Sequence, residues 1–369
     1  MADNGFETRA ISFSDVQRVS VAPSSATKLV SYRSYEVPTY MLADPYIVDE
    51  RHVVATGYGE EDKPSSQVTL FDMQTEASTY YMPMRDGWTI TDVVADAHSI
   101  YWVEQSHEYS HYIWAIVRQP RDGSKPTRIR SKGTTKQAVN VPQLAFDGRF
   151  LVWMERAGAT WSTAKTIYVV YDAQTEQVAK LANANQYWQM YDGLHVEQGK
   201  VCFIDRSDSA SRYLIRCFDA ARRKEELRLT AGNRMLDQVS YDGTRAVFSV
   251  IEDEKDRRGK QYSYDLETGV LHCIVDSKRE WLNDMSGDNM LVEDRTENGS
   301  PAVYLSARNR LLRLPKVEYE GRPVVASLGS MKGNRVAMPA SQPMGKGVYG
   351  LPEYWRYLLV VYELPVGWM

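Results

Sequence analysis

Acidic and amide side chains recur at one position along this chain, a few residues ahead of a turn that is itself repeated. They are Asp92, Gln143, Asp237, Gln238 and Asp284, with Asp44 and Asn283 beside the series. Carboxylate and amide oxygens from several strands can bind a hard cation or a polar ligand. Carboxylates such as Asp92, Asp237 and Asp284, with His195 as a base, could also support hydrolase or lyase chemistry. Either chemistry requires a fold that brings these distant residues to one place.

Other patterns that carry chemistry are absent or weak. The sequence holds no G-x-S-x-G nucleophile elbow, H-E-x-x-H pair, glycine-rich phosphate loop or calcium loop of the D-x-[DN]-x-[DN]-G kind. His107 and His111 flank Glu108, and imidazole with carboxylate suits zinc. An exposed polar loop has the same composition, and a hairpin does not bring residues i and i+4 together as a helix does. We therefore predict no metal site and no cofactor.

The three cysteines, Cys202, Cys217 and Cys273, form no C-x-x-C pair and are too few for a disulfide framework. Cys202 and Cys217 fall on strands that we expect to pair across one hairpin. A redox or metal role is conceivable for that pair, but buried free thiols are the simpler interpretation because cysteine packs as a small apolar residue.

A turn recurs seven times along the chain, each time followed by a short apolar run. The turns begin at Asp49, Asp96, Asp147, Gln198, Asp242, Gly287 and Lys332. Successive starts lie 47, 51, 51, 44, 45 and 45 residues apart. A period of this length, built from strands and turns, is typical of one blade of a β-propeller.

The third repeat shows how one unit folds into a blade. Residues 150–155 and 166–171 alternate or are rich in β-branched and aromatic side chains, which predicts two strands joined by a hairpin. The turn at Asp172–Glu176, where the Asp side chain can bond its own backbone two residues on, leads to a third strand at 177–181. Residues 141–146 supply the innermost strand. Similar turns at Asp72 and Asp265 keep the same phase in other repeats.

These features predict an all-β fold, a seven-bladed β-propeller of four-stranded antiparallel blades, because the apolar period is near two throughout. We place the blades at about residues 39–87, 88–137, 138–186, 187–234, 235–280, 281–323 and 324–369. A strand at 28–35 has no blade of its own, and we expect it to complete the last blade and close the ring. Residues 1–27 remain as an N-terminal extension ahead of a single propeller domain at 28–369.

The repeat resembles that of TolB-like β-propellers, in which an Asp-Gly turn precedes an apolar strand and an Ile-Tyr-x-x-Asp-x-x-Thr-Gly segment follows. Residues 147–153 and 166–175 carry this resemblance, which covers most of 39–364 at the level of the repeat. It implies a propeller and no particular function, since such repeats occur in periplasmic binding proteins, in serine peptidases and in single-domain proteins. The turns at Gln198, Gly287 and Lys332 depart from the pattern.

Composition narrows the classes of partner. The net charge is −4, with 43% apolar and 25% charged residues, so there is no general attraction to nucleic acid or to anionic membranes. The N-terminus shows no secretory signal, and no apolar run is long enough for a transmembrane helix. We therefore expect a cytoplasmic or virion-associated protein.

The sequence favours a non-catalytic binding or scaffold propeller over an enzyme. Its partner would be a protein or a larger assembly, for example as a structural subunit of a phage tail or injection machine. Aromatic residues in long loops are the candidate anchors, since interfaces favour Trp and Tyr; they are Trp161, Tyr349 and Tyr354. The alternative is a hydrolase or lyase, or a protein that binds a small ligand or cation, using the polar residues around the propeller axis.

Overall fold

The fold was analysed in a computed structural model. The structure describes residues 6–37, 40–58, 66–106, 113–133, 138–139, 141–158, 165–184, 194–206, 213–253, 258–278, 281–286, 289–294, 300–326, 329–344 and 354–365. Helical structure in these ranges is limited to α1 (Ser24–Thr27) and the single 3-10 turn η1 (Ser306–Arg308). No helix among the described residues is long and apolar enough to cross a membrane.

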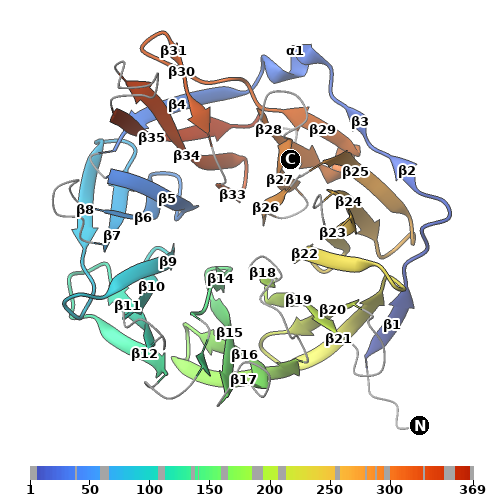
Figure 1. The fold of residues 1–369 in the computed structure, drawn as a ribbon, viewed down its shortest axis with the longest axis horizontal. Helices are drawn as coiled ribbons and strands as arrows, with labels where there is room; N and C mark the ends of the chain where they lie inside the picture. Colours follow the sequence, from blue (N-terminus) through green and yellow to red (C-terminus); the bar gives the residue numbers. More distant parts are fainter. Residues whose placement is uncertain are drawn as a thin grey trace.

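Seven antiparallel sheets surround one axis, each with its first strand innermost (Figure 1). Blade 1 contains β5 (Tyr40–Ile47), β6 (His52–Tyr58), β7 (Ser66–Asp72) and β8 (Ala77–Tyr81). Blade 2 contains β9 (Thr89–Ala95), β10 (Ser99–Gln105), β11 (Trp114–Pro120) and β12 (Thr127–Lys132). Blade 3 contains β14 (Leu144–Phe146), β15 (Phe150–Gly158), β16 (Lys165–Asp172) and β17 (Gln177–Ala184), and β13 (Ala138–Val139) also pairs with β15.

Blade 4 contains β18 (Leu194–Glu197), β19 (Lys200–Arg206), β20 (Tyr213–Asp219) and β21 (Lys224–Thr230). Blade 5 contains β22 (Met235–Tyr241), β23 (Arg245–Asp253), β24 (Arg258–Asp265) and β25 (Leu271–Lys278). Blade 6 contains β26 (Trp281–Ser286), β27 (Asn289–Asp294), β28 (Ser300–Leu305) and β29 (Arg310–Arg313). Blade 7 contains β32 (Val325–Ala326), β33 (Ser330–Lys332), β34 (Arg335–Met344) and β35 (Tyr354–Glu363), and a small hairpin, β30 (Glu318–Tyr319) and β31 (Arg322–Pro323), precedes it. The predicted seven-bladed fold is confirmed.

The core lies between the blades, because each sheet has two apolar faces and buries both against its neighbours. Tyr168 of blade 3 stacks on Phe203 of blade 4 with their ring centroids 3.7 Å apart. Trp102, Trp114 and Trp153 are fully buried. The aromatic side chains therefore fill the wedges between sheets, as their recurrence along the sequence predicts.

An aspartate carboxylate stabilises both kinds of repeated turn by accepting hydrogen bonds from the backbone. Asp147 Oδ1 accepts the backbone N–H groups of Arg149 and Phe150 at 2.9 and 2.8 Å, and Gly148 adopts a φ of +96° that favours glycine. Equivalent bonds form at Asp49, Asp96 and Asp242. In the second turn Asp172 Oδ1 accepts the N–H of Gln174 at 3.0 Å, which confirms the predicted bond to the backbone two residues on.

The ring closes through β4 (Ser31–Glu36), which pairs antiparallel with β35 in a register that joins Ser31 to Glu363 and Glu36 to Leu358. The early strand thus completes the last blade, as the sequence predicts. Blade 7 thus combines an early strand, β4, as its outermost strand with late strands from residues 325–363.

Residues 6–22 form what we call the N-terminal belt. Its strands β1 (Glu7–Ala10), β2 (Gln17–Arg18) and β3 (Ser20–Val21) add in parallel to β21, β25 and β29, the outermost strands of blades 4, 5 and 6 (Figure 1). Ile11 is buried, and the Phe13 ring packs edge-on against Tyr262 at 5.3 Å. The belt therefore occupies the outer edges of three successive blades before the chain enters blade 7.

Candidate functional site

Asp92, on the innermost strand of blade 2, connects two blades. Its carboxylate accepts the backbone N–H of Val93 at 2.8 Å and that of Leu144 in blade 3 at 2.6 Å. Burial raises the pKa of Asp92 to about 7, and the nearby carboxylate of Asp44 in blade 1 adds to that shift, while the two N–H groups oppose it. The side chain is thus a fixed acceptor between neighbouring inner strands.

Two other inner-strand residues make the same kind of contact. His195 Nδ1 of blade 4 accepts the N–H of Tyr241 in blade 5 at 3.3 Å, and the Ser330 hydroxyl of blade 7 accepts the N–H of Ile47 in blade 1 at 3.3 Å. In each case the acceptor belongs to one blade and the backbone donor to the next. Polar groups around the axis therefore hold adjacent blades in register.

The remaining residues predicted to line the axis have different surroundings. Gln143 is exposed and Asp237 is partly buried. Gln238 is only 2% exposed and accepts the Ser249 hydroxyl at 3.4 Å, so it lies inside blade 5 rather than on an accessible axial surface as expected. Asp284 lies on β26, but its side chain is outside the described part of the structure.

The predicted partner-binding aromatics stay predictions. Trp161 and Tyr349 lie outside the described residues, as do His107 and His111. Tyr354 begins β35 and pairs with Met344, and its side chain is not described. Among the residues that the structure places, no group of three or more His, Cys, Asp or Glu side chains is arranged to hold a metal ion.

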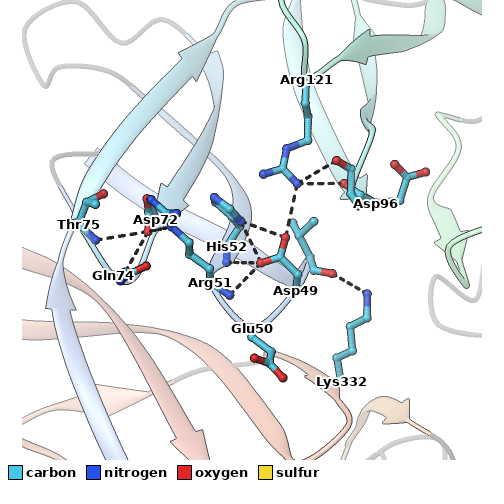
Figure 2. A network of polar contacts seen from close by, with 12 residues as sticks. Asp49, Glu50, Arg51, His52, Asp72, Gln74, Thr75, Asp96, Arg121 and Lys332 are labelled. Carbon is cyan, nitrogen blue, oxygen red and sulfur yellow. Dashed lines mark hydrogen bonds and ion pairs between the residues drawn. The ribbon is translucent and has the colours of Figure 1, made fainter.

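A second polar network joins blades 7, 1 and 2 at the turns that follow their inner strands. Figure 2 shows Asp49 at its centre, where it accepts from His52 Nδ1 at 2.9 Å and faces Arg121 of blade 2 at 3.5 Å. Lys332 of blade 7 donates to the carbonyl oxygen of Val48 at 2.7 Å. Partial burial lowers the pKa of Lys332, although the carboxylates around it act to raise it. These contacts stabilise the junction between the first and last blades.

A third set of acidic residues shares one position in blades 2, 3 and 4, five residues after the start of the second strand. The residues are Glu104, Glu155 and Asp205. All three are almost fully buried, at 0%, 0% and 3% exposed. A buried carboxylate is costly unless donors surround it. The partners of these three residues therefore show how each blade compensates for a buried carboxylate.

Glu155 and Asp205 both have cationic partners. Glu155 accepts from Arg130 at 2.8 Å and Lys132 at 2.8 Å, both on the outermost strand of blade 2, and from Trp153 Nε1 at 3.1 Å. Burial raises the pKa of Glu155, but these donors outweigh it and the pKa is lowered. Asp205 pairs with Arg216 at 2.9 Å.

Glu104 departs from this pattern. Its Oε2 accepts the backbone N–H of Met84 at 2.8 Å, but Oε1 has no hydrogen-bond partner within the described structure. The indole Nε1 of Trp102, two residues earlier, also has none, whereas the matching Trp153 donates to Glu155. A buried acceptor and a buried donor thus stand unpaired at one blade boundary.

The outer edge of blade 1 lies beside that boundary. Large apolar side chains that are exposed within the described ranges are Val21, Leu29, Tyr80, Met82, Met84 and Val178. Three of them fall on β8 or directly after it, at 42%, 48% and 41% exposed. We call Tyr80, Met82 and Met84 the blade 1 patch. Met84 joins this surface to the interior, because its side chain is exposed while its N–H donates to Glu104.

Reasoning from the sequence missed the buried acids. A signal was present, since Trp102-Val103-Glu104 and Trp153-Met154-Glu155 repeat the same W-x-E pattern in phase with the turns. The pattern does not reveal which acid lacks a cation, because the partners of Glu155 come from the neighbouring blade.

No family model matches the chain, and no curated protein matches it. The resemblance to TolB-like repeats therefore stays a prediction. Among solved structures, the chain resembles the β-propeller domain of the Trilobed protease from Pyrococcus furiosus at 13% identity, covering 82% of this chain and 91% of that one, with a TM-score of 0.55.

Two further structures are similar over most of their length. An oligogalacturonate lyase in complex with manganese is 13% identical, covering 92% of each chain, with a TM-score of 0.52. A chain of the mitotic checkpoint complex is 10% identical, covering 94% of this chain and 95% of that one, with a TM-score of 0.50. At such identities the likeness shows the propeller fold and no activity.

Proposed function

We propose that this propeller is a non-catalytic binding protein that docks a protein partner on the outer edge of blade 1. The blade 1 patch carries the proposal, because exposed methionine and tyrosine side chains gathered at one place are typical of protein interfaces. Membership of a large assembly such as a phage tail or injection machine is one form that this function would take.

Among the described strands, four outer edges of the ring carry no further strand, and they differ in a way that supports this choice; they are β8, β12, β17 and β4. β4 contains Arg33 and Glu36. β12 contains Arg128, Arg130 and Lys132, and β17 contains Lys180. Charged residues on an edge strand discourage the addition of another strand. β8, with the sequence Ala-Ser-Thr-Tyr-Tyr, has no charge. Blade 1 is therefore the open edge best suited to receive a partner strand.

The chain itself supplies an example of such docking. The N-terminal belt adds short strands to the outer edges of blades 4, 5 and 6 through backbone hydrogen bonds and a few apolar anchors such as Ile11. Strand addition of this kind is a common mode of peptide recognition. A partner segment would use the same mode on β8.

The test is capture of the partner from the native source, followed by mass spectrometry. We expect Met82→Asp to abolish a stoichiometric partner, because it places a charge in the blade 1 patch. Val178→Asp is the matched control, since Val178 is an exposed apolar residue on the edge strand of blade 3. Retention of the partner by Met82→Asp, or loss from both variants alike, would refute the proposal.

A hydrolase or lyase that uses Asp92, Asp237, Asp284 and His195 is the second candidate. One observation favours it: a carboxyl with a pKa of about 7 suits general acid–base chemistry at neutral pH. The hydrogen bonds from Leu144 to Asp92 and from Tyr241 to His195 favour the structural role. Turnover that Asp92→Asn abolishes in a protein that melts as the wild type does would support the enzyme instead.

A further inference from the structure

We propose that Glu104 receives a basic side chain of the docked partner, an inference that rests on the proposed binding at blade 1 and names the chemistry of the partner. The evidence is a comparison inside the molecule. Glu104 and Glu155 occupy the same position in successive blades, and both are 0% exposed. Among the described residues, Glu155 has two cationic partners, whereas Glu104 accepts one hydrogen bond, from the backbone N–H of Met84.

The position of the missing partner follows from blade geometry. Arg130 and Lys132, the cations that reach Glu155, lie two residues apart on the outermost strand of the preceding blade. Alternate residues of a strand point to the same side, which is why both reach one carboxylate. The preceding blade for Glu104 is blade 1, and its outermost strand, β8, carries no basic residue. The positions equivalent to Arg130 and Lys132 therefore carry no cation, and a long basic side chain from a strand added outside β8 would have to reach past β8 to supply one.

The unpaired groups also indicate that the ligand is a peptide rather than a metal ion. Glu104 Oε1 needs a donor, and Trp102 Nε1 needs an acceptor. In blade 3 the equivalent Trp153 and Glu155 bond to each other, and Glu155 still receives two basic side chains, so an arginine or lysine of an extended peptide is the group that blade 2 lacks. The apolar surface of Met82 and Met84 would pack against the rest of that segment.

Access to Glu104 passes through Met84. Because Glu104 is fully buried, docking would require the chain around Met84, whose N–H donates to Oε2, to shift so that the partner's cation can reach Oε1. The carboxylate would then exchange one neutral donor for a charged one, and charge-assisted hydrogen bonds are roughly twice as strong as neutral ones. Docking and the neutralisation of Glu104 are thus one event.

The experiment uses a probe that the chain provides. A fluorescent peptide with the sequence of residues 126–133, Pro-Thr-Arg-Ile-Arg-Ser-Lys-Gly, presents the two cations that satisfy Glu155. We expect it to bind the full-length protein in an anisotropy titration, and Glu104→Gln to raise the Kd at least about tenfold. The control variant Asp122→Asn removes one exposed carboxylate from the same blade and should leave the Kd unchanged.

A second peptide, with glutamine in place of Arg130 and Lys132, makes the test independent of how Glu104→Gln folds. It should bind the wild-type protein at least about tenfold more weakly. Equal binding of the two peptides, equal binding by Glu104→Gln and wild type, or no binding of the basic peptide to the wild type would each overturn the inference. A native partner that Glu104→Gln retains but Met82→Asp loses would overturn it while leaving the proposed function in place.

Discussion

Glu104 and Glu155 stand at the same position in neighbouring blades, each two residues after a buried tryptophan, but within the described ranges only Glu155 is paired with basic side chains. Comparing the two residues thus shows how the partners of a buried carboxylate affect its contribution to stability. Burial of a charged group is tolerated when donors surround it and is expensive when they are missing.

The two residues should therefore respond differently to the same substitution. Glu155→Gln leaves Arg130 and Lys132 without a carboxylate, and we expect it to lower the free energy of unfolding by about 1–3 kcal/mol. Glu104→Gln keeps an acceptor for Met84 and removes a poorly compensated charge, so the free energy should stay within about 0.5 kcal/mol or rise. Urea unfolding of both variants checks this. Equal losses would show that Glu104 has donors equivalent to those of Glu155.

Asp92→Asn should remove a pH dependence. The folded pKa of about 7 lies above the ordinary value of about 4, so the folded state holds this proton more tightly than the unfolded chain does. The stability that Asp92 contributes is full below about pH 4 and is lost as the pH rises to about 7. Across that interval the wild type should lose stability relative to Asp92→Asn, as denaturant unfolding at several pH values would reveal. A constant difference between the two proteins would contradict the shift.

Asp172 should matter more than its ion-pair partner. Asp172 pairs with Arg149 at 3.0 Å and also accepts the N–H of Gln174, and the hydrogen bond from Arg149 is the main cause of its lowered pKa. Arg149→Ala removes an ion pair that solvent screens on the Arg149 side, and such pairs contribute little to stability. Asp172→Ala also removes the turn bond, so we expect a loss of about 1–2 kcal/mol. Thermal melts of the two variants compare them, and a larger loss for Arg149→Ala would be unexpected.

The cysteine pair should be chemically silent in the folded protein. Cys202 and Cys217 face each other across β19 and β20, as the sequence predicts, with their sulfur atoms 3.3 Å apart and both side chains fully buried. Burial raises the pKa of Cys217, which disfavours the reactive thiolate. A thiol reagent should label these residues only after denaturation. Rapid labelling of the native protein would contradict this placement.

The fold was accessible from sequence because two turns repeat in phase, and each depends on local chemistry. Asp147 with Gly148, and Asp172 with Gln174, form bonds that a few adjacent residues determine. The strand at 31–36 was also predictable, because the seven repeats leave a predicted strand at 28–35 without a blade of its own.

The remaining features depend on contacts distant in sequence. β2 and β3 are two exposed residues each, too short to show an apolar period, so no periodicity marks the belt. Gln238 lies inside its blade because the register of β22 shifts between Leu236 and Val239, which changes the side to which residues point. Glu104 finds no cation on β8 because that strand, which belongs to another blade, carries no basic residue, and the residues next to Glu104 in the sequence do not reveal this.

The belt and β4 pair with strands that are synthesised much later, which orders the assembly of the propeller. The segment from Glu7 to Glu36 is synthesised before its partner strands β21, β25, β29 and β35, and the last of these ends at Glu363. At about 5–20 residues per second, those early residues wait tens of seconds for their partners. Closure of the ring by β4 therefore waits until β35 has been synthesised.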